Sequence, residues 1–233
     1  MNKKVIVALD FDSPVKALDF VEKLDPDLCR VKIGKELFTA SGPELVRKIM
    51  AKNFEVFLDL KFHDIPNTVG NAVSVAADLG VWMLNLHISG GMKMMEAARR
   101  SLETGGAKSP ILVGVTVLTS LSKEDLMQMG IKKSVEEHVS SLALLAQDSG
   151  LDGVVCSASE TKLLRSILPK DFCLVTPGIR RLEDIKNDQK RTAGPAEAIR
   201  NGSDYLVVGR PITQAKSPIN ALIEFNSAIT NFS

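Results

Sequence analysis

The sequence predicts an α/β fold, a single (β/α)8 TIM barrel that spans residues 1–233. Three observations predict it: eight short apolar runs recur along the chain, a helical pattern follows each run, and no linker or low-complexity segment divides them. The length of 233 residues is typical of this fold but would also fit two small domains. The repeated alternation, rather than the length, therefore carries the prediction.

The eight candidate strands are rich in β-branched residues and are almost continuously apolar. Parallel strands that are buried on both faces have this composition, whereas half-exposed strands alternate between apolar and polar residues. The runs cover residues 5–11, 28–34, 55–62, 82–88, 111–118, 153–158, 173–179 and 205–212.

The helical patterns between the runs have recognisable starts. Ser13-Pro14 and Ser217-Pro218 each offer an N-cap followed by proline at the first helical position, and Ser134 with Glu137 fits a capping box. Apolar residues then recur every three or four positions, which predicts one apolar face per helix, packed on the barrel. They include Leu45 and Ile49, Val69 and Val73, Val135, Val139 and Leu142, and Leu222 and Ile229.

An open, doubly wound sheet is the alternative α/β architecture. Its dinucleotide-binding form would require Gly-x-Gly-x-x-Gly after the first strand, and the chain instead has Ala8-Leu9-Asp10-Phe11-Asp12-Ser13. This difference favours the barrel.

Composition narrows the possible partners and the compartment. Lys and Arg (29) nearly balance Asp and Glu (28), so the net charge of +1 gives no field that would recruit nucleic acid or an anionic membrane. Cys29, Cys156 and Cys173 are separated and lie in apolar runs, which predicts reduced thiols. Asp10 and Asp12 interrupt the first apolar run too early for a signal peptide, and no stretch is long enough to span a bilayer. We expect a cytoplasmic protein.

Polar residues interrupt the apolar runs near their ends, where barrels place their chemistry. Asp59 and Lys61 are the most informative, because buried charges are costly unless paired and residues two apart in a strand share one side. With Asp10 and Lys32 from neighbouring strands they predict an alternating array of four charges. The alternative is an ion-pair network with a purely structural role. Further polar residues near these ends are Asn85, His87, Thr116 and Thr119.

Asp64 and two histidines have ordinary interpretations when taken alone. Asp64 follows the third strand just before Pro66 begins a helix, where the helix dipole favours any carboxylate. His63 has the pattern of a loop residue. His87 fits a satisfied buried group as well as it fits a wall of the site.

Two strand ends predict a phosphate cradle. Val208-Gly209-Arg210 combines a glycine, which lets an anion approach the backbone, with a planar guanidinium. Thr176-Pro177-Gly178-Ile179-Arg180 precedes a polar loop that ends near Gln189. Barrels commonly bind phosphate at the loops after strands 7 and 8, although this polar loop also fits a solvated surface excursion.

These motifs resemble the orotidine 5′-phosphate decarboxylase family, and specifically its bacterial branch, over essentially the whole chain. Asp-x-Lys-x-x-Asp alone is shared with related sugar-phosphate barrels, whereas the extended run 59–68 together with Pro-Gly-Ile-Arg is more specific. The motifs are Ala8-Leu9-Asp10, Lys32-Ile33-Gly34, Asp59-Leu60-Lys61-Phe62-His63-Asp64-Ile65-Pro66-Asn67-Thr68, Val117-Leu118-Thr119-Ser120, Thr176-Pro177-Gly178-Ile179-Arg180 and Val208-Gly209-Arg210-Pro211-Ile212.

The resemblance implies the decarboxylation of orotidine 5′-phosphate to UMP without a metal or cofactor. It implies that Lys61 is the catalytic lysine, flanked by Asp59 and Asp64, and that Lys32 completes the charge array. Asp10 and Lys32 match positions that hold the ribose, and Thr119 matches the position that recognises the pyrimidine edge. The remaining implied substrate-binding residues, most of them at the phosphate end, are Pro177, Arg180, Gln189, Gly209 and Arg210.

The resemblance also implies a homodimer with shared active sites. The residues matching Asp64, Ile65 and Thr68 would reach into the site of the partner subunit, which would explain an acidic residue just beyond the strand. Two other functions remain possible: a Mg²⁺-dependent sugar-phosphate decarboxylase or hexulose-phosphate synthase of the related barrels, and a binding-only barrel. The complete charge array argues against a barrel that has lost its chemistry.

Overall fold

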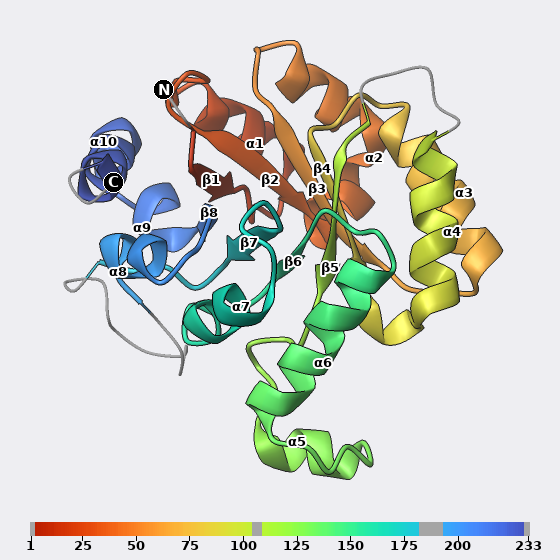
Figure 1. Cartoon of the computed structure of the whole chain (residues 1–233). Helices are drawn as coiled ribbons and strands as arrows, with labels where there is room; N and C mark the ends of the chain where they lie inside the picture. Colours follow the sequence, from red (N-terminus) through yellow and green to blue (C-terminus); the bar gives the residue numbers. More distant parts are fainter. Residues whose placement is uncertain (1–2, 104–108, 182–192, 231–233) are drawn as a thin grey trace.

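The computed structural model describes residues 3–103, 109–181 and 193–230, and its centre is a closed barrel of parallel strands (Figure 1). Each strand pairs with the next, and β8 pairs with β1 to close the ring. The predicted (β/α)8 barrel is therefore confirmed. The strands are β1 Val5–Ala8, β2 Arg30–Gly34, β3 Val56–Phe62, β4 Met83–His87, β5 Ile111–Val115, β6 Gly153–Val155, β7 Cys173–Thr176 and β8 Tyr205–Val208.

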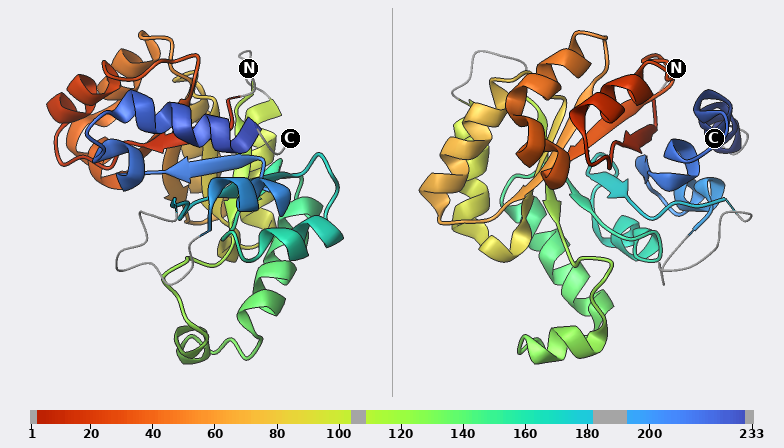
Figure 2. Two further views of the ribbon diagram at one scale, coloured as in Figure 1. Left: turned by 90° about the vertical axis from the view of Figure 1, so that its left-hand side faces the viewer. Right: turned by 180° about the vertical axis from the view of Figure 1, so that it is seen from behind.

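Helices surround the barrel, and α10 packs against α8, α9 and β1 where the ring closes (Figures 1 and 2). The segment between β5 and β6 holds two helices, of which α5 projects away from the barrel (Figure 1). The described helices are α1 Pro14–Val21, α2 Lys35–Met50, α3 Pro66–Ala77, η1 Ile88–Gly90 (a 3-10 turn), α4 Met92–Glu103, α5 Lys123–Gln128, α6 Val135–Asp148, α7 Thr161–Ile167, α8 Pro195–Arg200, α9 Arg210–Thr213 and α10 Pro218–Thr230.

The helix starts follow the local sequence. The capping box of Ser134 and Glu137 is formed at α6, and a second one joins Ser122 to Asp125 at α5. Proline occupies the first turn of α1, α3 and α8, where its missing N–H costs nothing. The predicted apolar helix positions are buried, from Leu45 in α2 to Ile229 in α10.

Apolar side chains form two separate cores. The outer core lies between the strands and the helices and contains most of the buried residues. A smaller core contains Ile6, Ala8, Phe57, Met83, Val113, Val175 and Val207. Because Ala8, Phe57 and Val207 also line the central pocket, this smaller core fills the barrel interior and forms the pocket floor.

The strand register explains why charged residues face the barrel mouth. Ala8 is paired with Lys32, and Lys32 with Phe57, so these three residues stand at one level. Asp59 lies two residues beyond Phe57, and Asn85 two residues beyond Met83. Since side chains alternate along a strand, Asp59 and Asn85 continue the inward-facing rows toward the carboxyl ends.

Most of the predicted strands were too long at their carboxyl ends. The prediction that Arg210 lies in strand 8 was wrong, because β8 ends at Val208 and α9 begins at Arg210. Gly209 turns the chain out of the sheet with ψ −108°, and Pro211 has no N–H to donate to a ladder. Thr119 likewise lies in a turn after β5. These residues still lie at the mouth of the barrel, but on loops and helix starts.

The cysteines and the helices bear on the expected compartment. All three cysteines are free; Cys29 and Cys156 are buried beside strands, and Cys173 begins β7. Within the described ranges, no helix combines the length and apolar character needed to cross a bilayer.

Candidate active site

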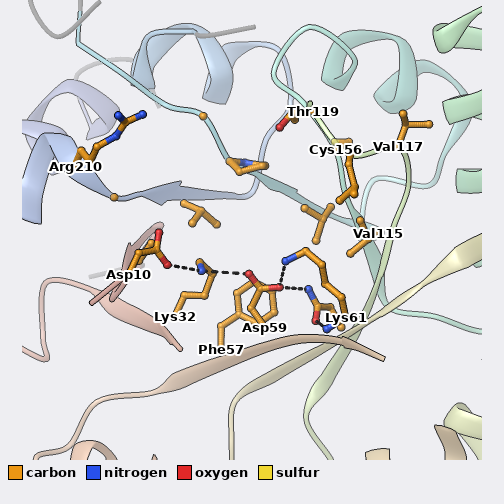
Figure 3. Close-up of a pocket in the computed structure, with 18 of the residues that line it drawn as sticks. Asp10, Lys32, Phe57, Asp59, Lys61, Val115, Val117, Thr119, Cys156 and Arg210 are labelled. Carbon is orange, nitrogen blue, oxygen red and sulfur yellow. Dashed lines mark hydrogen bonds and ion pairs between the residues drawn. The ribbon is translucent and has the colours of Figure 1, made fainter. Parts of the chain in front are cut away.

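A pocket of about 370 Å³ opens at the carboxyl ends of the strands (Figure 3). It brings together most of the residues singled out from the sequence, although they come from six different strands or strand ends. The predicted residues that line it are Asp10, Lys32, Asp59, Lys61, Thr119, Pro177, Arg180, Gly209 and Arg210.

Four charges of alternating sign form a continuous array along one side of the pocket, above its apolar floor (Figure 3). The Lys32 ammonium lies 3.1 Å from Asp10 Oδ1 and 3.2 Å from Asp59 Oδ2. Lys61 Nζ donates to Asp59 Oδ1 at 2.5 Å. The predicted arrangement of Asp10, Lys32, Asp59 and Lys61 as an array of paired charges is therefore confirmed.

The centre of this charge array is buried, unlike an ion pair at the surface. The side chains of Lys32 and Asp59 are only 11% and 10% exposed, whereas Asp10 is 66% exposed at the outer end. Burial alone would lower the pKa of Lys32, but attraction to Asp59 and Asp10 outweighs it and the pKa is raised. Burial alone would raise the pKa of Asp59, but Lys32 and Lys61 outweigh it and the pKa is lowered. Both groups are thus held in their charged forms.

The backbone at Lys61 is unusual. Its φ is +51°, in the left-handed region that residues with a Cβ rarely adopt, and the pairing of β3 with β4 is irregular between Leu58 and Phe62. The N–H of Lys61 is satisfied by the side chain of Asn85, whose Oδ1 accepts it at 2.8 Å. Strained backbone in a strand commonly marks a functional position.

The expected phosphate end lies on the loops after β7 and β8. Arg210 follows Gly209 at the start of α9, where the first N–H groups of a helix have no partner within the helix. Arg180 lines the same pocket, and its backbone N–H donates to the backbone oxygen of Ala193 at 3.1 Å. An isolated bridge between Ile179 and Ala193 joins the two ends of the intervening loop. Gln189 lies outside the described residues.

Three predicted residues are not among the described residues that line the pocket of their own chain. Asp64, Ile65 and Thr68 are all exposed, Ile65 to 66%. Asp64 accepts a hydrogen bond from the Ile65 N–H at 2.6 Å. Asp64 and Ile65 lie between β3 and α3, and Thr68 lies in the first turn of α3.

The two neighbouring histidines differ in environment. His63 is exposed, as expected for a loop residue, whereas His87 is partly buried at the end of β4. Their rings are 5.6 Å apart. Burial, followed by the proximity of His63 and Lys35, lowers the pKa of His87, so the ring is neutral at pH 7.

Sequence reasoning gave no role to two groups of pocket residues. Asn85 was only one of several polar residues at strand ends, yet its buried amide contacts both Asp59 and Lys61. An amide within the apolar run of β4 was the available signal. The second group is an apolar wall formed by Val115, Val117, Val155 and Cys156. Burial raises the pKa of the Cys156 thiol, which keeps it protonated and inert.

The donor set at Asp59 is poorly suited to a divalent cation. Asp59 Oδ1 accepts from Lys61 Nζ and Asn85 Nδ2, and Oδ2 faces the Lys32 ammonium. A cation bound there would have to displace a lysine. In the described part of the chain, no three His, Cys, Asp or Glu side chains are grouped as metal ligands.

The closed barrel and the charged pocket at the carboxyl ends of its strands define a TIM-barrel enzyme. The chain belongs to the orotidine 5′-phosphate decarboxylase / HUMPS family, whose model matches residues 3–225. It is 57% identical over 228 residues to an orotidine 5′-phosphate decarboxylase from Pseudoalteromonas atlantica, covering 98% of this chain and 99% of that one. It is 56% identical to one from Vibrio cholerae, with the same coverage.

Solved structures agree with this assignment. The crystal structure of orotidine 5′-phosphate decarboxylase from Lactobacillus acidophilus matches with a TM-score of 0.88 and 38% identity, covering 97% of this chain and 99% of that one. An uncharacterised conserved protein from Geobacillus kaustophilus matches with a TM-score of 0.84 and 36% identity, with the same coverage.

Proposed function

We propose that this chain catalyses the cofactor-independent decarboxylation of orotidine 5′-phosphate to UMP in pyrimidine biosynthesis. The observation that carries the proposal is the ion-pair array Asp10–Lys32–Asp59–Lys61, which is buried at Lys32 and Asp59 and ends on an ammonium that lines the pocket. Family membership and full-length relatives with this name support the same reaction. Like those proteins, the enzyme would bind a nucleotide monophosphate in the pocket.

The chemical problem is the electron pair left at C6 of the pyrimidine. When the bond from C6 to the carboxylate breaks, this pair lies in the plane of the ring, where the π system does not delocalise it. The Lys61 ammonium would stabilise the developing negative charge, which is electrostatic stabilisation of a transition state. It would then donate a proton to C6 in place of the lost CO2. The amine would recover its proton from solvent after product release.

Asp59 would contribute by repelling the substrate carboxylate. Two like charges about 4 Å apart repel by roughly 4 kcal/mol at an effective dielectric near 20, and departure of CO2 removes this repulsion. That amount is too small to explain a very large acceleration alone. Transition-state stabilisation and binding energy from the distant phosphate would supply the rest.

The other end of the pocket fits the phosphate and the base. Arg180, Gly209 and Arg210 would hold the phosphate, with Pro177 beside them, because guanidinium groups and backbone N–H groups match its oxygens. Asp10 and Lys32 would hold the ribose hydroxyls, and Thr119 the pyrimidine edge. Gln189 stays a prediction, as the residue that bridges phosphate and base.

We also propose a homodimer with shared sites. Asp64, Ile65 and Thr68 lie together on the surface outside their own pocket, and an isoleucine that is 66% exposed suits a subunit interface. From the partner subunit, Asp64 would approach Lys61 and extend the charge array. The cytoplasmic location expected from the composition is part of the same proposal.

The decisive experiment is an absorbance assay with orotidine 5′-phosphate in the presence and absence of EDTA. We expect turnover by the wild type in both conditions and none by Lys61→Ala, which should still bind UMP. Lys16→Ala, at an exposed lysine paired with Asp12, serves as the matched control and should retain full activity. A wild type without turnover would refute the proposed function.

The other outcomes identify the rival functions. Near-normal turnover by Lys61→Ala would exclude the proposed role of Lys61. Turnover of orotidine 5′-phosphate that EDTA abolishes and Mg²⁺ restores would refute the proposed cofactor independence, and turnover of a sugar phosphate with Mg²⁺ in place of orotidine 5′-phosphate would favour the related sugar-phosphate enzymes. UMP binding without turnover in the wild type would indicate a binding-only barrel.

A further inference from the structure

Asn85 is a polar residue between the apolar residues Leu84 and Leu86 of β4. Its neighbours Leu84 and Leu86 are fully buried, and Asn85 itself is only 1% exposed. A primary amide in such surroundings is unfavourable unless its donors and its acceptor are paired. The partners of Asn85 therefore indicate why an asparagine occupies this position.

Both ends of the Asn85 amide bind β3 at the charge array. Its Oδ1 accepts a hydrogen bond from the Lys61 N–H at 2.8 Å, and its Nδ2 donates to Asp59 Oδ1 at 2.6 Å. The same Asp59 oxygen accepts from Lys61 Nζ. One side chain thus fixes the backbone that carries the lysine and the carboxylate that holds its ammonium.

The contact with the Lys61 backbone replaces a missing strand interaction. Between Leu58 and Phe62 the regular pairing of β3 with β4 is interrupted, and Lys61 adopts φ +51° inside this irregularity. A left-handed residue with a side chain is strained and persists only where its surroundings hold it. The amide oxygen of Asn85 provides the acceptor that this conformation requires.

We propose that Asn85 is a positioning residue, which holds the left-handed backbone of Lys61 and the carboxylate of Asp59 so that the ammonium stands at the reacting carbon. Its effect on turnover rests on the proposed function, whereas its effect on the geometry of Lys61 does not. Asn85 acts through Lys61 and Asp59 and needs no contact with the substrate.

The bond to Asp59 adds an electrostatic consequence. Together with Lys32 and Lys61, the Nδ2–H donor helps to lower the pKa of Asp59. Removing this donor should therefore move the acid limb of the pH–rate profile toward higher pH. A residue that only filled space in β4 would leave that limb unchanged.

The test compares Asn85→Ala and Asn85→Asp with the matched control Asn226→Ala. Asn226 is a partly buried asparagine of α10 whose amide donates to Leu28 O at 3.0 Å, and it is not among the residues that line the pocket. Each variant is measured for kcat, KM, UMP binding, pH–rate profile and thermal stability, with rates expressed per folded protein.

We expect Asn85→Ala to lose about 10- to 100-fold in kcat, because misplacing a catalytic group by about 1 Å has effects of this size. KM and UMP binding should change by less than about threefold, since the proposed phosphate contacts lie at the other end of the pocket. Asn226→Ala should lower only the thermal stability. An unchanged kcat and pH profile for Asn85→Ala would overturn the proposal.

Asn85→Asp separates the two hydrogen bonds. It keeps an oxygen for the Lys61 N–H but replaces the donor to Asp59 by a second carboxylate. We expect a crystal structure of this variant to retain a positive φ at Lys61 while kcat falls by about tenfold or more. If Asn85→Ala does not fold, this variant decides the question, and normal turnover by it would overturn the proposal.

Crystal structures make the inference independent of the proposed function. In Asn85→Ala, Lys61 should leave the left-handed region and its ammonium should separate from Asp59. If both remain as they are in the wild type, the inference is wrong, whatever reaction the enzyme catalyses. If the wild type does not decarboxylate orotidine 5′-phosphate, the proposed function fails and the structures still decide the role of Asn85.

Discussion

Replacing Lys32 by methionine should destabilise the protein far more than the same change at an exposed lysine. Methionine has a similar length and no charge, so Lys32→Met leaves Asp59 without one of its two cationic partners. Lys16, whose ion pair with Asp12 is 2.9 Å long, provides a control with the same substitution in a fully solvated setting.

The magnitude follows from distance and burial. At 3.2 Å and an effective dielectric near 20, the attraction between Lys32 and Asp59 is about 5 kcal/mol. The variant no longer buries the ammonium, which returns several kcal/mol, so the net loss should be about 2–4 kcal/mol. Attraction to Asp10 adds little, because that carboxylate is 66% exposed and well screened.

The pH dependence of this loss has a definite sign. The folded pKa of Asp59 is lowered, so its stabilisation is present above the unfolded pKa of about 3.9 and disappears as the pH falls through the folded value. Lys32 is the largest attractive cause of this lowering. The difference between the wild type and Lys32→Met should therefore be greatest near pH 7 and shrink below about pH 4.

The assay is urea denaturation of the three proteins at one protein concentration and at several pH values. We expect a clear shift of the midpoint for Lys32→Met and no measurable shift for Lys16→Met. Equal shifts for both variants, or a pH-independent loss for Lys32→Met, would contradict the reasoning from burial.

Three further substitutions test other parts of the structure. Arg210→Ala should lower kcat/KM for orotidine 5′-phosphate by about 10- to 100-fold, since each charge-assisted hydrogen bond contributes about 1.5–3 kcal/mol. The affinity for UMP should fall while the affinity for uridine does not. Equal losses of affinity for both would show that Arg210 does not bind the phosphate. Gly153→Ala would place a Cβ 2.2 Å from the backbone oxygen of Cys173, so we expect little soluble protein, whereas Gly194→Ala meets nothing within 4 Å and should express normally. His87→Gln should flatten the dependence of folding stability on pH between about pH 7 and pH 5.5. Burial lowers the pKa of His87 in the folded protein, so the wild type loses stability as the pH falls below the unfolded pKa of about 6.5. A pH dependence parallel to that of the wild type would show that His87 does not titrate in this way.

Much of the fold could be predicted because it depends on local patterns. Parallel strands are apolar on both faces, and the capping box at Ser134 lies within one turn of chain, so both were visible in the sequence. Strand ends were less predictable. Val208 and Arg210 are two positions apart in one apolar run, and the loss of ladder partners after Gly209 decides that one ends β8 and the other begins α9.

The candidate site also has a part that the sequence predicted and a part that it did not. Charges at Asp59 and Lys61 had to be paired because buried charges are costly, and this predicted the array with Asp10 and Lys32. The role of Asn85 could not be predicted, because it depends on the irregular register of β3 against β4 and on one backbone angle. Such a contact joins residues 24 positions apart in the chain and has no local pattern.

By itself, the sequence determined the barrel, the charged residues at its mouth and the family resemblance, since these follow from composition, periodicity and motifs. Only the tertiary structure decided which oxygen of Asp59 faces which lysine, that Lys61 adopts a strained backbone, and that Asp64 lies outside its own pocket. The physical reason is that hydrogen bonds and ion pairs are sensitive to differences of a few tenths of an ångström in the distance between their atoms. Those distances are set by strand register and packing across the whole barrel.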